Sequence, residues 1–121
     1  MVQVLVIDDE EEVRFTLQAL LEAAGHEVKL AVNGRDGVAA YKAQPADLVI
    51  TDIIMPDQEG IETITQLYAH DPKAKVIAMS GGGRVGNMDF LQIAQRLGAK
   101  QVLRKPIRPE DLTNAVTQAL A

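Results

Sequence analysis

Polar side chains that could do chemistry follow short stretches typical of β-strands, each at the point where the stretch ends. The positions are Asp8-Asp9 after residues 2–7, Asp52 after residues 48–51, Ser80 after residues 75–79 and Lys105 after residues 100–104. Short stretches rich in β-branched and apolar residues indicate buried strands. These polar residues are therefore predicted to stand at strand ends, where they can be presented to a ligand.

The residue types favour phosphoryl chemistry with a hard metal ion. Asp8, Asp9 and Asp52 would crowd three carboxylates together if their strands are neighbours, and such a cluster is costly unless a cation neutralises it. Oxygen ligands without nearby His or Cys suit Mg²⁺ better than zinc. Lys105 and the Ser80 hydroxyl would serve the oxygens of a transferring phosphoryl group, and a carboxylate can act as the nucleophile.

A strand followed by a helix is predicted five times along the chain. Besides the four strands above, a fifth is expected at residues 27–31, and helical spacing of apolar residues predicts helices at 10–24, 35–43, 61–70, 88–97 and from Pro109 onward. Gly25 and Gly98 stand where left-handed helix caps occur, and Asn33-Gly34 indicates a turn. Strict alternation predicts an α/β fold with a doubly wound parallel sheet covered on both faces.

The expected strand order decides where the site lies. In the flavodoxin-like order 2-1-3-4-5, ligands bind at the carboxyl ends of the strands, between the first and third strands. Asp8, Asp9 and Asp52 follow these two strands. We expect one domain over residues 1–121.

Composition bounds the class of function. The chain has 121 residues, a formal charge of -5, 47% hydrophobic residues and no cysteine. The acidity argues against direct nucleic-acid binding, the absence of cysteine excludes disulfides, and no apolar run reaches membrane-spanning length. We therefore expect a soluble cytoplasmic protein without membrane insertion.

The spaced motifs resemble the receiver domain of two-component response regulators over the whole chain. The matching residues are Val4-Leu5-Val6-Ile7-Asp8-Asp9-Glu10, Asp52-Ile53-Ile54-Met55-Pro56 with Gly60, Ser80, and Lys105-Pro106. The resemblance implies that Asp52 accepts a phosphoryl group from a histidine kinase or phosphotransfer protein. It further implies that Mg²⁺ is held by Asp9, Asp52 and the backbone carbonyl of Ile54, with Asp8 acting through water. Ser80 and Lys105 would contact the phosphoryl group, with a cis peptide before Pro106.

Each of these residues, taken singly, also fits an ordinary structural role. Asp9 with Glu12 could cap a helix, Asp52 could be a loop carboxylate, and Ser80 and Lys105 could belong to turns. A phosphatase of the haloacid-dehalogenase type also uses an aspartate and Mg²⁺, but it needs a second aspartate two residues later, where Ile54 stands. A pseudo-receiver that binds partners without being phosphorylated is the third possibility. His26 and His70 lie away from the predicted site, so the donor should be another protein.

Signal output is expected through protein contacts. The resemblance favours the face formed by the fourth helix, fifth strand and fifth helix, where Arg84, Arg104 and Arg108 add positive charge, and a homodimer is possible. Many receivers carry an aromatic switch residue where Val102 stands, so another signal route is expected. Glycine-rich residues 81–86 could rearrange on phosphorylation.

A further expectation concerns how long the phosphoryl group lasts. Ile54 is apolar and offers no help to an attacking water, so slow hydrolysis of the phosphoryl group is expected.

Overall fold

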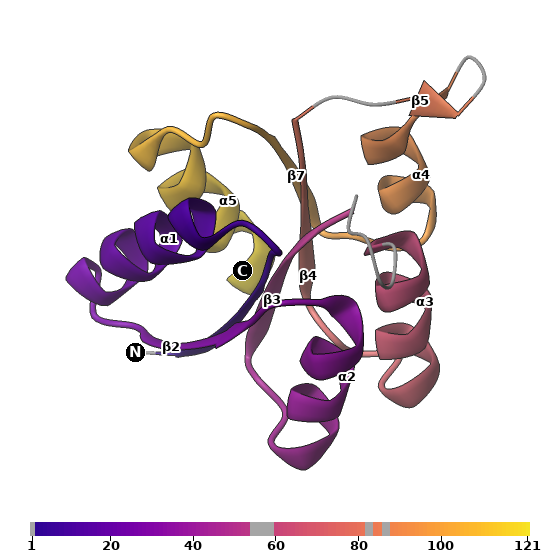
Figure 1. Cartoon of the computed structure of the whole chain (residues 1–121), viewed down its shortest axis with the longest axis horizontal. Helices are drawn as coiled ribbons and strands as arrows, with labels where there is room; N and C mark the ends of the chain where they lie inside the picture. Colours follow the sequence, from indigo (N-terminus) through magenta and orange to yellow (C-terminus); the bar gives the residue numbers. More distant parts are fainter. Residues whose placement is uncertain (1, 54–59, 82–83, 86–87) are drawn as a thin grey trace.

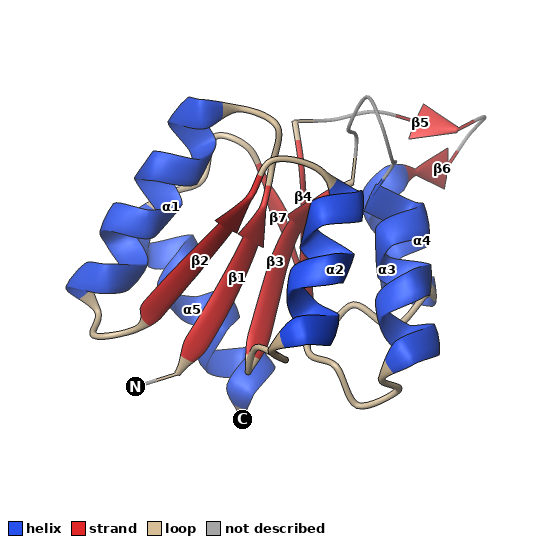
Figure 2. Cartoon of the chain, turned by 60° about the horizontal axis from the view of Figure 1, so that its bottom comes forward, coloured by secondary structure: helices blue, strands red, loops and turns tan. Residues whose placement is uncertain are grey.

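Five parallel strands form the central sheet of the computed structural model, which describes residues 2–53, 60–81, 84–85 and 88–121, with the backbone alone at 84–85 and 88–91. The strands are β1 (Gln3–Ile7), β2 (Glu27–Ala31), β3 (Leu48–Asp52), β4 (Val76–Ser80) and β7 (Gln101–Arg104). Their spatial order is β2-β1-β3-β4-β7, and every neighbouring pair is parallel (Figure 2). Since β7 is the fifth long strand in the chain, the predicted order 2-1-3-4-5 is confirmed.

Helices cover both faces of this sheet. They are α1 (Glu11–Ala23), α2 (Gly34–Ala43), α3 (Gly60–His70), α4 (Phe90–Arg96) and α5 (Pro109–Leu120). In Figures 1 and 2, α1 and α5 lie on one face, and α2, α3 and α4 on the other. The doubly wound arrangement is therefore confirmed.

Alternation along the strands builds one core on each face. In β1, Val4 and Val6 pack in the core beneath α1 and α5, whereas Leu5 and Ile7 pack in the core beneath α2 and α3. Side chains of a strand point to opposite faces in turn, and both faces here are covered. All four side chains are buried, so β1 is fixed in the middle of the molecule, with its carboxyl end beside that of β3.

Cap residues define where the helices begin and end. Gly25 and Gly98 have φ of 92° and 111°, the left-handed conformation predicted for them after α1 and α4. Asn33 is the N-cap of α2, where its side chain accepts a hydrogen bond of 2.8 Å from the Asp36 N–H. The turn signal at Asn33-Gly34 thus marks the start of a helix.

The segment before α4 departs from the prediction. Residues 88–97 were predicted to be helical, but α4 begins at Phe90, and Met88–Asp89 forms strand β6, antiparallel to β5 (Arg84–Val85) (Figure 2). Two residues per strand are too few for periodicity to reveal. The loop expected over residues 81–86 therefore contains strand β5.

Candidate functional site

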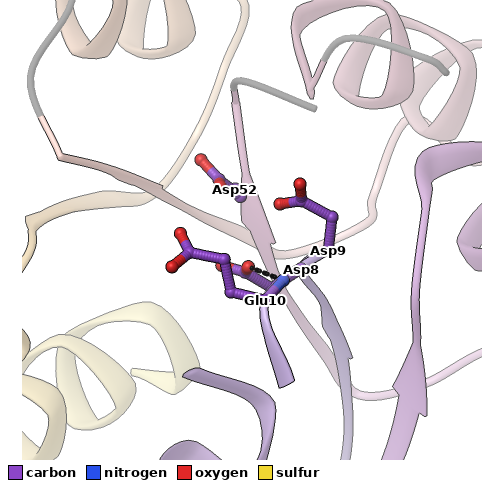
Figure 3. A group of neighbouring side chains, drawn as sticks. All are labelled: Asp8, Asp9, Glu10 and Asp52. Atoms are coloured by element: carbon purple, nitrogen blue, oxygen red, sulfur yellow. Dashed lines mark hydrogen bonds between the residues drawn. The ribbon is translucent and has the colours of Figure 1, made fainter. Parts of the chain in front are cut away.

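Four carboxylates meet at the carboxyl ends of β1 and β3. Asp8, Asp9 and Glu10 follow β1, Asp52 ends β3, and one carboxylate oxygen of each lies within 4.8 Å of the others (Figure 3). The cause is the parallel register, in which Ile7 is paired with Thr51, so the next residues of both strands emerge side by side. The structure thus brings together Asp8, Asp9 and Asp52, as expected, and adds Glu10.

Asp8 is the most buried of the four carboxylates. It has no exposed surface; its N–H donates to the Ala31 carbonyl at 3.1 Å, and its Oδ1 accepts from the Glu10 N–H at 2.8 Å (Figure 3). Burial raises the pKa of Asp8 above its ordinary value, against the opposing effects of the Glu10 N–H and Lys105. The other oxygen, Oδ2, faces the Lys105 ammonium and accepts no second hydrogen bond from the described residues, so it keeps one lone pair for a further ligand.

Lys105 reaches this cluster from the loop after β7. Its Nζ lies 2.9 Å from Asp8 Oδ2, 3.0 Å from Asp52 Oδ2 and 3.3 Å from Glu10 Oε1. Burial alone lowers the pKa of Lys105, but its bonds to Asp8 and Asp52 outweigh burial and raise the pKa above the ordinary lysine value. The ammonium is therefore fully charged at neutral pH. Among the described residues, one cation faces four carboxylates, which gives this cluster an excess of negative charge.

Ser80 is fully buried at the end of β4, the strand between β3 and β7. Its carbonyl accepts a hydrogen bond of 2.8 Å from the Lys105 N–H, which fixes the start of the loop that carries Lys105. The peptide bond between Lys105 and Pro106 is cis, as the resemblance implied. Ile54, whose carbonyl was predicted to bind metal, lies outside the described residues.

The end of β3 is held by close packing against the start of α3. The Thr51 hydroxyl donates to the Asp52 carbonyl at 2.9 Å, and the Gly60 N–H donates to the Ile53 carbonyl at 3.1 Å. A Cβ on Gly60 would overlap the Asp52 carbonyl oxygen and the Ile53 Cα. Glycine is therefore required at residue 60 for the backbone beside Asp52 to keep its position.

Two residues at this site were not predicted from the sequence. Glu10 is the N-cap of α1 without a side-chain capping bond, so its carboxylate is available to Lys105. The same observation rules out Asp9 and Glu12 as a capping pair, because the cap is neither of them. Arg14 donates from Nη1 to the Asp8 carbonyl at 2.9 Å. Its position four residues after Glu10, one helical turn away, is the only sequence signal for this contact.

The arrangement suits a hard divalent cation and a phosphoryl group. Its donors are carboxylate oxygens, the ligands that Mg²⁺ prefers, and the buried oxygen Asp8 Oδ2 is paired within the described residues with Lys105 alone. Asp52 is 4% exposed, so the residue is mostly buried but keeps a small surface that solvent can reach. Lys105 supplies a cation beside it. The residues present therefore fit Mg²⁺.

The two histidines lie apart from these residues. His26 directly precedes β2, and His70 is the last residue of α3, so both are at the edge of the sheet where the strands begin. The carboxylates lie at the edge where the strands end. Neither histidine can therefore serve the carboxylate cluster within one molecule.

Comparison with known proteins identifies the family. The family model of the response regulator receiver domain matches residues 4–117, so the chain belongs to the response regulator receiver family. Receivers of this family are the phosphorylation-dependent signalling modules of two-component systems. The fold and the matched motifs agree with this assignment along nearly the whole chain.

The relatives include single-domain chemotaxis proteins. The chain is 35% identical to chemotaxis protein CheY of Thermotoga maritima over 117 residues, which cover 96% of this chain and 95% of that protein. It is 31% identical over 121 residues to Protein PilH of Pseudomonas aeruginosa, covering 100% of this chain and 99% of that protein. The chain therefore resembles these proteins over nearly their full length.

Solved structures of the same fold agree. A response regulator receiver domain protein from Clostridium thermocellum superposes with a TM-score of 0.89 at 32% identity, covering 99% of this chain and 94% of that chain. Chemotaxis protein CheY4 of Vibrio cholerae has a TM-score of 0.89 at 26% identity and 99% coverage of both chains.

Across the described part of the chain, no helix is long and apolar enough to cross a membrane.

Proposed function

We propose that this receiver accepts a phosphoryl group on Asp52, in a Mg²⁺-dependent reaction, from a phosphohistidine on a histidine kinase or phosphotransfer protein. The observation that carries the proposal is the position of the Asp52 carboxylate, 3.0 Å from Lys105 Nζ and within the carboxylate cluster. Asp52 is the one cluster member at the end of β3, and the other three belong to the turn after β1. A nucleophile and its electrostatic partners are therefore supplied by different strands.

The transfer needs only a nucleophile and charge stabilisation from this chain. One carboxylate oxygen of Asp52 attacks the phosphorus, the new O–P bond forms as the P–N bond of the donor breaks, and the electron pair of that bond stays on the imidazole, which takes up a proton. Lys105 stabilises negative charge on the phosphoryl oxygens as they arrive beside Asp52. Ser80, buried on the adjacent strand, is proposed to offer its hydroxyl to the same oxygens.

Mg²⁺ would be held by Asp9 and Asp52, with Asp8 acting through a water molecule and the Ile54 carbonyl as a further ligand. When bound, the ion neutralises the crowded carboxylates and the charge that develops on the transferring group. Asp8 Oδ1 is already bonded to the Glu10 N–H, so the bridging water would share Oδ2 with Lys105 Nζ, which lies 2.9 Å from that oxygen.

The output is proposed to be a change in protein contacts at the face formed by α4, β7 and α5. Arg104 and Arg108 are exposed beside β7 and α5, and the Lys105 N–H bond to Ser80 links this strand directly to the site. Val102 packs partly buried against the core on the α4 side, where a valine has no ring to swing. A homodimer formed on phosphorylation is an alternative output, which sedimentation velocity with and without beryllofluoride would detect.

Intact-mass spectrometry tests the proposal most simply. The protein is incubated with Mg²⁺ and acetyl phosphate, beside Asp52→Asn and the matched control Asp111→Asn, whose exposed carboxylate lies on α5. We expect a single added phosphoryl group in the wild type and in Asp111→Asn, and none in Asp52→Asn.

Each contrary outcome contradicts the proposal in its own way. Absence of any adduct would indicate an interaction module that is not phosphorylated, and multiple turnover of phosphate esters would indicate a phosphatase.

The lifetime of the phosphoryl group is a separate prediction. Because Ile54 is apolar, the phosphorylated protein is expected to lose its phosphoryl group slowly. Rapid Mg²⁺-dependent loss of the phosphoryl group would contradict that expectation.

A further inference from the structure

We propose that Arg14 is a positioning residue that sets the geometry of the metal-binding turn after β1. From the first turn of α1, its Nη1 donates a hydrogen bond of 2.9 Å to the carbonyl oxygen of Asp8. That carbonyl belongs to the peptide unit joining Asp8 to Asp9. The inference rests on the proposed Mg²⁺ site and names a residue that acts on that site without touching the ion.

Arg14 completes the restraints on Asp8. The Asp8 N–H is bonded to the Ala31 carbonyl, and its Oδ1 is bonded to the Glu10 N–H. With the carbonyl fixed by Arg14, Oδ2 is the remaining polar atom of Asp8, and it faces Lys105 and the site. Strand β2 thus binds the N–H of Asp8, and residues at the start of α1 bind its carbonyl oxygen and Oδ1.

The bond also acts on Asp9. A planar peptide unit can turn only about ψ of Asp8 and φ of Asp9, so fixing the Asp8 carbonyl leaves φ of Asp9 as the one backbone rotation that directs the Asp9 side chain. The bond from the Glu10 N–H to Asp8 Oδ1 limits that rotation. Asp9 is exposed, with little packing to hold it otherwise. Arg14 is therefore placed to align Asp9 with Asp52 across the site.

The positive charge of Arg14, taken alone, should weaken Mg²⁺ binding, whereas its positioning role should strengthen it. A positive side chain near the start of a helix opposes the helix dipole, and a cation close to the carboxylates repels a second cation. If Arg14 acted only through its charge, removing it would tighten Mg²⁺ binding. If Arg14 acts by positioning, removing it weakens Mg²⁺ binding, so the sign of the change separates the two effects.

The test is a Mg²⁺ titration of the folded protein, followed by NMR of the Asp9 and Glu10 amides. Arg14→Met keeps the aliphatic stem and is expected to weaken Mg²⁺ binding about tenfold, the usual effect of losing a group that orients a metal ligand. Arg35→Met is the matched control, because Arg35 is an exposed arginine in the first turn of α2 at the same edge of the sheet. It should change the affinity by less than about twofold, since it makes the same change of net charge without the bond to Asp8.

A second readout separates positioning from general stabilisation. Urea unfolding is measured in EDTA and at one fixed Mg²⁺ concentration for the wild type and for Arg14→Met. Since the stabilisation by a bound ligand rises with the logarithm of the ratio of its concentration to its Kd, the stabilisation that this Mg²⁺ adds should shrink in the variant. A purely structural role would lower both stabilities equally. Arg14→Lys, at unchanged net charge, is expected to weaken binding severalfold and serves if Arg14→Met does not fold.

The outcomes distinguish this inference from the proposed function. Wild-type or tighter Mg²⁺ affinity in whichever Arg14 variant folds would overturn the positioning role while leaving the proposed site intact. Failure of the wild type itself to bind Mg²⁺ would overturn the proposed site and this inference with it.

Discussion

At the scale of single residues, Asp8 is a carboxylate held entirely out of contact with solvent. It has no exposed surface, and burial raises the pKa of Asp8 despite the nearby Lys105. Its charged form is thus disfavoured in the folded protein without metal. This cost is the reason to expect that the site trades stability for ion binding.

Asp8→Asn is expected to stabilise the metal-free protein at pH 7 by on the order of 1 kcal/mol, because it removes a buried charge while keeping the side-chain shape. Because the folded pKa is above the unfolded value of 3.8, folded Asp8 binds the proton more tightly, and the cost of its charge is absent below pH 3.8. The difference between variant and wild type should therefore shrink as pH falls through the folded pKa. Urea unfolding in EDTA over a pH series measures this difference in unfolding free energy.

The contrary result for Asp8 is equally clear. A variant less stable than the wild type at pH 7 would show that the Lys105 ion pair outweighs the burial of the Asp8 carboxylate. In saturating Mg²⁺ the order should reverse, because the wild type alone keeps the full ligand set.

Gly60 is the second residue considered at this scale, because its lack of a side chain lets α3 approach the backbone beside Asp52. Gly60→Ala is expected to cost about 3 kcal/mol of unfolding free energy, because the new methyl group would overlap the backbone at Asp52 and Ile53. Gly81→Ala is the matched control, since a Cβ there meets no atom within 4 Å, and its effect should be under about 0.5 kcal/mol. Thermal or urea unfolding of both variants gives the comparison, and equal small effects would contradict the close approach.

At the scale of elements, α2 and α3 are tied together at the edge opposite the site. The buried Tyr41 of α2 donates its hydroxyl to Asp71 Oδ2, after α3, at 2.8 Å, and burial together with this bond raises the pKa of Tyr41 to about 12. The same hydrogen bond is the main cause that lowers the pKa of Asp71. Both changes indicate a protonated tyrosine bound to an ionised carboxylate.

Tyr41→Phe should therefore destabilise the protein by about 1 kcal/mol, the usual net value of one hydrogen bond, without changing phosphorylation of Asp52. Tyr68→Phe serves for comparison, because the hydroxyl of that half-buried tyrosine donates to the Gly98 carbonyl at 2.7 Å and joins α3 to the turn after α4. Urea unfolding measures the stability of each variant, and intact-mass spectrometry measures its phosphorylation. Loss of phosphorylation in Tyr41→Phe would show that the two edges of the sheet are coupled.

The segment between β4 and α4 is where a response to phosphorylation is expected. It begins directly after the buried Ser80 and contains the β5–β6 hairpin. We predict that phosphorylation of Asp52 changes the order or position of the segment 81–86, of which residues 82, 83 and 86 lie outside the described residues, and of the start of α4. The prediction rests on the glycines in the sequence of this segment, which make rearrangement inexpensive in backbone strain. NMR relaxation in the free and beryllofluoride-bound states measures this, and identical backbone order in the two states would contradict it.

At the scale of the whole molecule, the sheet order and helix faces were predictable because apolar periodicity and strict alternation leave few topologies. The meeting of Asp8, Asp9 and Asp52 followed from the same order, since parallel neighbours end at one edge. The β5–β6 hairpin escaped prediction because two-residue strands carry no periodicity. Glu10 and Arg14 escaped it because an exposed acidic residue and a helical arginine look like ordinary surface residues until the turn after β1 is seen in three dimensions.

The central claim is that Asp52, rather than another carboxylate of the cluster, carries the phosphoryl group. Borohydride reduces an aspartyl phosphate to homoserine, so the protein is phosphorylated with acetyl phosphate and Mg²⁺, reduced and digested, and its peptides are sequenced by mass spectrometry. We predict homoserine at residue 52 and unchanged residues at Asp8, Asp9 and Glu10. Reduction at any of those three positions, with Asp52 intact, would contradict the account.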